Sequence, residues 1–164
     1  MASQPGRLIA VAVDPGDESL YALTWCLNNV VTKPKPEEDS KDTLVLLYAR
    51  PPRALYPSMD GTGYLFSSDI MASMDRYGRE VADTVIERAR KTCASYPYVN
   101  VESKVEVGDP RDVICEAVEK LNADLLVMGS HGYGLIKRAF LGSVSNHCAQ
   151  NVKCPVLIVK RPKQ

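Results

Sequence analysis

The stretch "DLLVMGSHGYGLIKRAFLGSVSNHCAQNV", residues 124–152, joins a short apolar run to a glycine-rich connection and a polar segment. Residues 124–129 begin with an aspartate, continue with four apolar residues and end at a glycine, which is typical of a buried strand. From Ser143 to about Val152 we expect a helix. The stretch therefore predicts a strand, a loop and a helix, which is the repeating unit of a parallel α/β sheet.

The rest of the chain repeats this alternation. Four more short segments are rich in aliphatic or β-branched residues and are bounded by Pro, Gly or Asp, namely 8–14, 43–49, 99–107 and 155–160. Between the strands, apolar residues recur at spacings of three and four, which indicates amphipathic helices. These residues are Leu20, Leu23, Leu27, Val30 and Val31, then Met74, Tyr77, Val81 and Val85, and later Val113, Ile114, Ala117, Val118 and Leu121.

The alternating order predicts the architecture. Segment 99–107 alternates between apolar and polar residues and suits an edge strand, whereas the other four strands are almost continuously apolar and suit positions between two helical layers. With right-handed crossovers, we predict one α/β domain over residues 1–164. It contains a doubly wound, Rossmann-like, five-stranded parallel sheet in the order 3-2-1-4-5, with helices on both faces. Ligands bind such sheets at the carboxyl ends of the strands. The residues expected in that crevice are Asp14, Ala49, Gly108, Met128 and Gly129.

Composition excludes several partners. Lysine plus arginine and aspartate plus glutamate both number 20, so charge gives no reason to expect a nucleic-acid partner. The first apolar run is too short to span a membrane, so we expect a cytoplasmic protein without membrane contact. The five cysteines form no C-x-x-C pair and indicate reduced thiols. No histidine has a second ligand at metal spacing, so we predict no metal site made of protein ligands.

Two standard nucleotide motifs fail on spacing. A dinucleotide fingerprint needs G-x-G-x-x-G after the first strand, but "DPGDES" has one glycine. A P-loop would use Gly129 and Gly134, yet Leu135 and Ile136 occupy the positions of its lysine and hydroxyl residue. Without that lysine or an evident water-activating base, the chain favours holding a nucleotide over cleaving it.

A different glycine pattern remains. Gly129-x-x-Gly132 is followed by nine residues and then by Gly142-Ser143 at the predicted helix start. Glycines let backbone N–H groups approach an anion, and a helix N-terminus attracts negative charge. Further donors nearby are Ser143, Ser145, Lys137 and Arg138. Spacing alone leaves a plain connector, with Ser143 capping the helix, open as the alternative.

The segment "GSHGYGLIKRAFLGSVS" matches G-x2-G-x9-G-[ST] and resembles the ATP-binding members of the universal stress protein family. Similar blocks are "VAVDPGDES", "LVLLYARPP", "VEVGDPRDVICEAVEKLNADLLVMGSHG" and "VSNHCAQNVKCPVLIVK". The resemblance covers roughly residues 7–161 and is greatest to the small single-domain members common in plants.

This resemblance implies a set of nucleotide-binding residues. The first strand end would reach the nucleoside through Ala12, Val13 and Asp14, with Asp14 accepting ribose hydroxyls; its alternative role is to cap the following turn. Ala49 would leave room for adenine beside its backbone. The residues implied around the phosphates are Met128, Gly129, Gly132, Gly142, Ser143, Val144 and Ser145. Ser130 and His131 are weaker candidates, and no carboxylate is visibly placed to orient His131 as a catalyst.

The resemblance also implies a function. We expect a protein that binds ATP or AMP, with Mg²⁺ able to accompany the phosphates, and acts in stress response as a nucleotide-dependent sensor or regulator. A slow ATPase, or a chaperone or adaptor with incidental nucleotide binding, are the alternatives. The apolar strand 155–160 would join its counterpart in a homodimer. The long connection 50–69 suits either a lid or a plain mobile loop.

Overall fold

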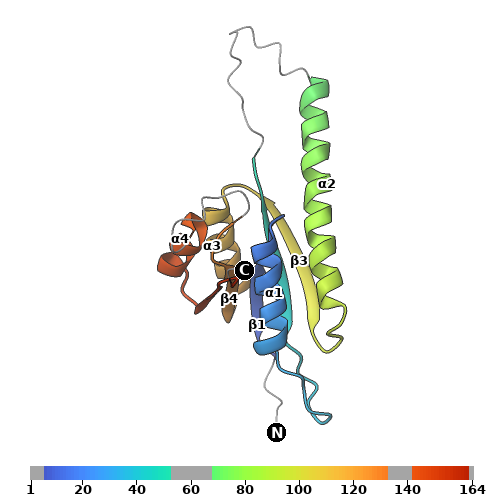
Figure 1. Ribbon diagram of the computed structural model, residues 1–164, viewed down its shortest axis with the longest axis vertical. Helices are drawn as coiled ribbons and strands as arrows, with labels where there is room; N and C mark the ends of the chain where they lie inside the picture. Colours follow the sequence, from blue (N-terminus) through green and yellow to red (C-terminus); the bar gives the residue numbers. More distant parts are fainter. Residues whose placement is uncertain (1–5, 53–67, 133–141, 163–164) are drawn as a thin grey trace.

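Strands and helices alternate through the parts of the chain that the computed structural model describes, which are residues 6–52, 68–132 and 142–162. Figure 1 shows their arrangement. The elements are β1 (Leu8–Ala12), α1 (Asp17–Asn29), β2 (Thr43–Arg50), α2 (Ser68–Cys93), β3 (Asn100–Val107), α3 (Pro110–Leu121), β4 (Leu125–Gly129), α4 (Ser143–Asn151) and β5 (Val156–Val159). Among these helices, none is long and apolar enough to cross a membrane.

The five strands form one parallel sheet in the order β3-β2-β1-β4-β5, which confirms the predicted topology. The central strand β1 pairs with β2 and β4, so that Ile9 lies between Leu44 and Leu125. Every residue of β3 is exposed or half-buried, as expected for an edge strand. Because all strands run the same way, their carboxyl ends meet at one edge of the sheet.

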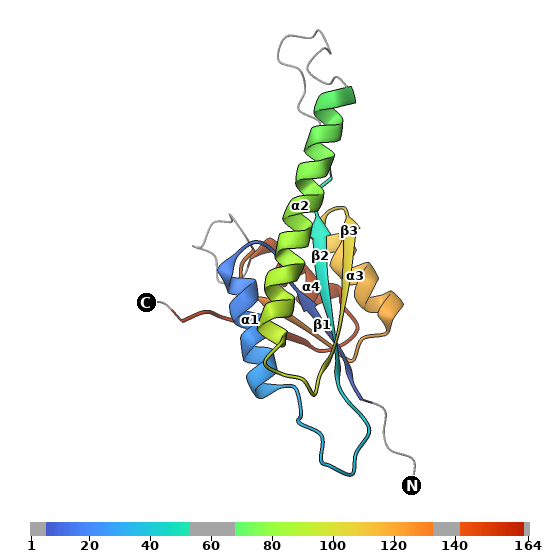
Figure 2. The same ribbon diagram turned by 90° about the vertical axis from the view of Figure 1, so that its right-hand side faces the viewer.

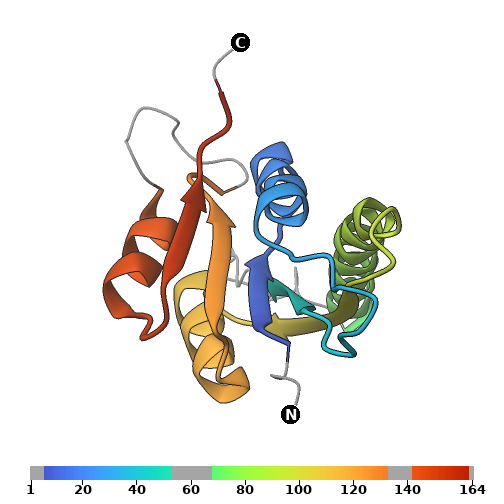
Figure 3. The ribbon, with the colours of Figure 1, turned by 90° about the horizontal axis from the view of Figure 1, so that it is seen from below.

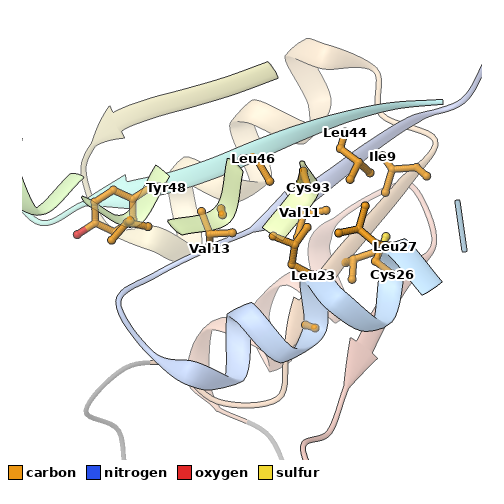
Figure 4. Packing of buried hydrophobic residues seen from close by; sticks show 14 of the residues in the cluster. Ile9, Val11, Val13, Leu23, Cys26, Leu27, Leu44, Leu46, Tyr48 and Cys93 are labelled. Atoms are coloured by element: carbon orange, nitrogen blue, oxygen red, sulfur yellow. The ribbon is translucent and has the colours of Figure 1, made fainter. Parts of the chain in front are cut away.

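Helices cover both faces of the sheet, with α1 and α2 on one side and α3 and α4 on the other (Figure 3). Successive side chains of β1 point to opposite faces. Ile9 and Val11 therefore pack against α1 residues such as Leu23 and Leu27 (Figure 4). Ala10 and Ala12 belong to the core on the α3 and α4 side. Small side chains on that second face leave space near the carboxyl end of β1.

The first strand is shorter than predicted. It ends at Ala12 rather than Asp14. Val13 still donates a backbone hydrogen bond to Leu47 O at 2.8 Å, but the chain then turns at Asp14 because that side chain binds backbone N–H of the next turn. The turn begins α1 at Asp17 and directs its first turn toward the carboxyl edge.

Helix α2 is longer than the apolar pattern predicted. It begins at Ser68, inside the segment expected to be a loop, and its N-terminal half projects beyond the sheet (Figures 1 and 2). Its buried residues all lie between Ala82 and Cys93, so Met74 and Tyr77 continue the apolar spacing in the sequence without being buried. The remainder of that connection, 53–67, lies outside the described residues, so the lid hypothesis stays a prediction.

Candidate functional site

A cavity of about 540 Å³ opens at the carboxyl edge of the sheet, between the strand ends and the N-termini of α3 and α4. Its volume falls within the range of small-molecule binding sites. Ten of the eleven residues predicted from the sequence line it, namely Ala12, Val13, Asp14, Ala49, Met128, Gly129, Gly132, Ser143, Val144 and Ser145. Gly142, the eleventh, is not among the lining residues; it is the N-cap of α4 and directly precedes Ser143, which lines the cavity.

The floor of the cavity is apolar and is made by three neighbouring strands. Ala12 ends β1, Ala49 lies near the end of β2, and Met128 precedes the last residue of β4. Two of these three side chains are methyl groups, so they cover the sheet without filling the space above it. The result is a shallow surface on which a flat apolar group could lie.

Asp14 shapes the turn that leaves this floor. Its Oδ1 accepts the Gly16 N–H at 2.7 Å and lies 3.1 Å from Ser19 Oγ. The Asp14 N–H donates to that same hydroxyl at 3.1 Å. These contacts confirm the capping role that the sequence left as an alternative. Asp14 also lines the cavity, so the ribose role stays a prediction that is compatible with the turn.

The N-terminus of α4 supplies backbone donors to the cavity. Its N-cap is Gly142, in an extended conformation and without a side-chain cap hydrogen bond. The first bond of the helix runs from Asn146 N–H to Gly142 O, so the N–H groups of Ser143, Val144 and Ser145 precede any intrahelical acceptor. Because all three residues line the cavity, this end of it is suited to an anion.

Glycine is favoured at two positions, 129 and 142, because the chain segments approach closely there. A Cβ on Gly142 would lie 3.1 Å from Ser130 O and 3.2 Å from His131 Cα, and a Cβ on Gly129 would lie 3.2 Å from the Glu18 carbonyl carbon. The Gly142 N–H also donates to Ser130 O at 2.6 Å. The two ends of the connection are therefore in direct contact, with β4 on one side and α4 on the other.

The hydroxyl of Ser145, expected from the sequence to donate to an anion, has a different role. It is buried and donates to Ser130 O at 2.8 Å, with Gly142 O at 3.1 Å. Its position on the inner face of α4 explains the difference, since the side chain points at the loop backbone. The Ser145 hydroxyl is therefore engaged within the protein, and its backbone N–H is the group left to face the cavity.

A carboxylate does lie beside His131, contrary to the expectation from the sequence. Glu18 Oε2 accepts the His131 N–H at 2.9 Å, and it lies 3.6 Å from His131 Nδ1 and 3.4 Å from Ser130 Oγ. The partners are 113 residues apart in the chain, which is why no local spacing revealed them. Glu18 comes from the first turn of α1, which the Asp14 turn directs to this edge.

The opposite wall is the N-terminus of α3, whose residues were missing from the sequence-based site. Asp109 caps the helix by accepting the Arg111 N–H at 2.9 Å, and the Arg111 guanidinium contacts the same carboxylate at 2.8 Å. These hydrogen bonds lower the pKa of Asp109 to about 2. The signal was present in the sequence, because "GDPRD" directly follows the third strand and contains Asp109, a helix-capping residue type, immediately before a proline.

Helix α2 closes one side of the cavity with Tyr77 and Val81. Its position is fixed by Arg50 at the end of β2, whose NH2 donates to Asp75 O at 2.8 Å and to Asp75 Oδ1 at 2.7 Å. Hydrogen bonds from Arg79 and Arg50 lower the pKa of Asp75 to about 2. Tyr77, counted from the sequence among the core-facing residues, is 69% exposed and faces the cavity mouth instead.

The remaining expectations from the sequence concern two basic residues, metal ligands and the cysteines. Lys137 and Arg138 lie outside the described residues. Within the ranges that are described, no group of three or more His, Cys, Asp or Glu residues could hold a metal ion. The cysteines of those ranges are free thiols, and burial raises the pKa of Cys26 and of Cys148 to about 12.

Comparisons with known proteins agree with this architecture. Universal stress protein PHOS34 of Arabidopsis thaliana is 27% identical, over 95% of this chain and 62% of that protein. Universal stress protein UspA of Lactobacillus plantarum has a TM-score of 0.73 at 19% identity, over 96% of this chain and 99% of that one. A universal stress protein family protein of Arabidopsis thaliana, solved with AMP bound, has a TM-score of 0.67 at 24% identity, over 95% and 92% of the two chains.

The extent of these matches differs between the comparisons. The chain spans only 36%, 62% and 65% of the length of three Arabidopsis relatives that it matches. The structural neighbours, at identities below 25%, establish the shared fold.

The model of the universal stress protein family matches residues 7–160, which include all strands and helices described above. The chain therefore belongs to the universal stress protein family.

Proposed function

We propose that this protein binds an adenine nucleotide, ATP or AMP, in the cavity at the carboxyl edge and acts in stress response as a nucleotide-dependent sensor or regulator. The observation that carries the proposal is the chemical division of the cavity, whose apolar strand floor meets the uncapped N-terminus of α4. A nucleotide has the same division, with a flat base at one end and phosphate at the other. The family member solved with AMP bound supports this choice of ligand.

The proposed orientation follows from where each chemical group is best satisfied. The phosphates would accept hydrogen bonds from the N–H groups of residues 143–145, at the positive end of the α4 dipole. The ribose hydroxyls would lie at Asp14, and the base would lie over Ala12 and Ala49. With ATP, Mg²⁺ held by phosphate oxygens and water would neutralise the remaining charge. The proposed contacts are Ala12, Val13, Asp14, Ala49, Met128, Gly129, Gly132, Gly142, Ser143, Val144 and Ser145.

Identifying the nucleotide that the purified protein carries tests the proposal. The protein is denatured, the released small molecules are separated by chromatography, and the melting temperature is measured with added ATP, AMP and adenosine. We expect released AMP or ATP, or a rise in melting temperature with both nucleotides that exceeds the rise with adenosine. Absence of released nucleotide together with absence of any shift at millimolar ligand would refute the proposal.

We further propose that the protein forms a homodimer through β5. This strand lies at the edge of the sheet, and Val156, Leu157 and Ile158 are apolar and only half-buried. Such an edge favours pairing with a second strand. Light scattering at micromolar protein should give twice the chain mass of 18.0 kDa. A stable species at the mass of one chain would contradict the dimer without affecting the proposed ligand.

A further inference from the structure

Glu18 connects α1 to the glycine-rich connection through a compact set of contacts. Its Oε2 accepts the His131 N–H at 2.9 Å and lies within 3.6 Å of His131 Nδ1. Ser130 Oγ lies 3.4 Å from the same oxygen and 3.1 Å from His131 Nδ1. The side chains of Glu18 and His131 are 17% and 10% exposed, so these contacts are largely shielded from water. Shielding strengthens hydrogen bonds to a charged group.

These contacts determine which donors the connection can offer. The Ser130 N–H donates to Val159 O at 3.2 Å, and the His131 N–H donates to Glu18. Both backbone donors at the β4 end are therefore engaged within the protein. At the α4 end, the N–H groups of residues 143–145 have no intrahelical acceptor. Glu18 thereby helps to direct anion binding toward α4.

Residues 130 and 131, which contact Glu18, are also hydrogen-bonded to or in close contact with the start of α4. Ser130 O accepts both the Gly142 N–H at 2.6 Å and the Ser145 hydroxyl at 2.8 Å. Gly142 begins α4, and its Cβ position would be only 3.2 Å from His131 Cα. The carboxylate therefore fixes residues 130 and 131, and these residues in turn fix the first turn of α4.

We propose that Glu18 is a positioning residue for the phosphate end of the cavity. It holds the segment 130–131 against α4, and it sets the orientation of the His131 side chain, which lines the cavity. This inference rests on the proposed nucleotide binding and assigns Glu18 a role in distinguishing phosphorylated from unphosphorylated adenosine.

Calorimetric titration with AMP and with adenosine tests the assignment. Glu18→Ala should weaken AMP binding about tenfold or more, because the phosphate donors lose their alignment, and should change adenosine binding less than about twofold. Glu18→Gln retains an oxygen acceptor for the His131 N–H and should stay within about threefold of the wild-type AMP affinity. Asp17→Ala is the matched control, since Asp17 lies beside Glu18 but its side chain is 68% exposed. It should leave both affinities unchanged.

A ligand-free measurement keeps the inference testable if neither compound binds. Amide hydrogen exchange of His131 and Gly142 should accelerate about tenfold or more in Glu18→Ala and should stay near the wild-type rate in Glu18→Gln and Asp17→Ala. Unchanged exchange in Glu18→Ala would overturn the inference, as would an equal loss of AMP and adenosine binding. Failure of the wild-type protein to bind either AMP or ATP, with exchange altered as predicted, would instead refute the proposed function alone.

Discussion

Two helices direct their N-termini at the same cavity, and they differ in how the first turn is satisfied. Helix α3 begins at Asp109, whose side chain accepts the Arg111 N–H. Helix α4 begins at Gly142, which has no side chain to cap it. A helix N-terminus attracts anions only where its N–H groups lack an acceptor. The comparison shows that the sequence of the cap determines which end of the cavity is suited to phosphate.

The electrostatics of the two ends follow the same division. The Arg111 guanidinium and N–H hold the pKa of Asp109 at about 2, so this carboxylate is ionised near neutral pH. That carboxylate is already paired with the Arg111 guanidinium, and it occupies the Arg111 N–H that could otherwise donate to an anion. Ile114 on the same helix lines the cavity and adds apolar surface. The α3 wall therefore suits the uncharged part of a nucleotide, and the α4 wall suits its phosphates.

Adding a carboxylate cap to α4 should produce the largest effect. In Gly142→Asp the new side chain would accept the N–H groups proposed for phosphate, and its charge would repel the ligand. We expect AMP binding to weaken about 100-fold by calorimetry. Gly142→Ala introduces the close contact with Ser130 O but no charge, and it should have a smaller effect. Equal AMP affinity in Gly142→Asp and in the wild-type protein would contradict the assignment of α4.

Removing the Ser145 hydroxyl should have a smaller effect, which we expect on the free energy of unfolding. This buried group donates to Ser130 O at 2.8 Å, so Ser145→Ala should lower the free energy of unfolding by about 1 to 2 kcal/mol in urea titrations. Ser143→Ala is the matched control, because Ser143 is exposed one residue inside the same cap. Its effect should stay within about 0.5 kcal/mol. Equal stability changes in the two variants would show that the Ser145 hydroxyl does not stabilise the contact between α4 and Ser130.

Removing the cap of α3 should affect stability without weakening phosphate binding. Asp109→Ala deletes the acceptor for the Arg111 N–H and should lower the free energy of unfolding by about 1 kcal/mol. Asp109→Asn retains a capping oxygen and should be nearly neutral. Neither substitution should reduce AMP affinity, since the proposed phosphate donors belong to α4. A marked loss of AMP binding in Asp109→Ala would indicate that the phosphate lies at α3, which would contradict its assignment to α4.

The pH dependence of the α3 cap should be the smallest effect. The folded-state pKa of Asp109, about 2, lies below the ordinary aspartate value of 3.8. Its stabilising contribution is therefore fully present above the unfolded-state pKa and is lost as pH falls through the folded-state value. The stability difference between the wild-type protein and Asp109→Ala should narrow from neutral pH to about pH 2. Urea titrations that give the same difference at both pH values would contradict this ionised cap.

The fold was predictable because the apolar patterns of the central strands reflect their burial. The segments 43–49 and 124–129 read as continuously apolar and form central strands, while the alternating segment 99–107 forms the edge. Helix α2 begins at Ser68, before Met74, which is the first residue of the apolar spacing that predicted the helix, and no residue of the helix before Ala82 is buried. Apolar spacing also could not tell that Tyr77 belongs to the projecting, exposed part of that helix.

The candidate site was predictable where it depends on topology and less so where it depends on long-range side-chain contacts. Residues such as Ala12, Ala49 and Met128 come together because parallel strands end at one edge. The contact between Glu18 and His131 joins positions 113 residues apart and has no local spacing rule. Asp109 was visible as a helix cap, but its place beside the cavity follows only from the packing of α3 on the sheet.

Backbone NMR with AMP and with adenosine tests the central claim most directly. On addition of AMP, the amide proton signals of Ser143, Val144 and Ser145 should move downfield, because these N–H groups acquire a phosphate acceptor. Adenosine should leave these three signals nearly unchanged while perturbing residues of the strand floor such as Ala12 and Ala49. Shifts specific to AMP that concentrate at the start of α3, or identical responses to the two compounds, would contradict the account.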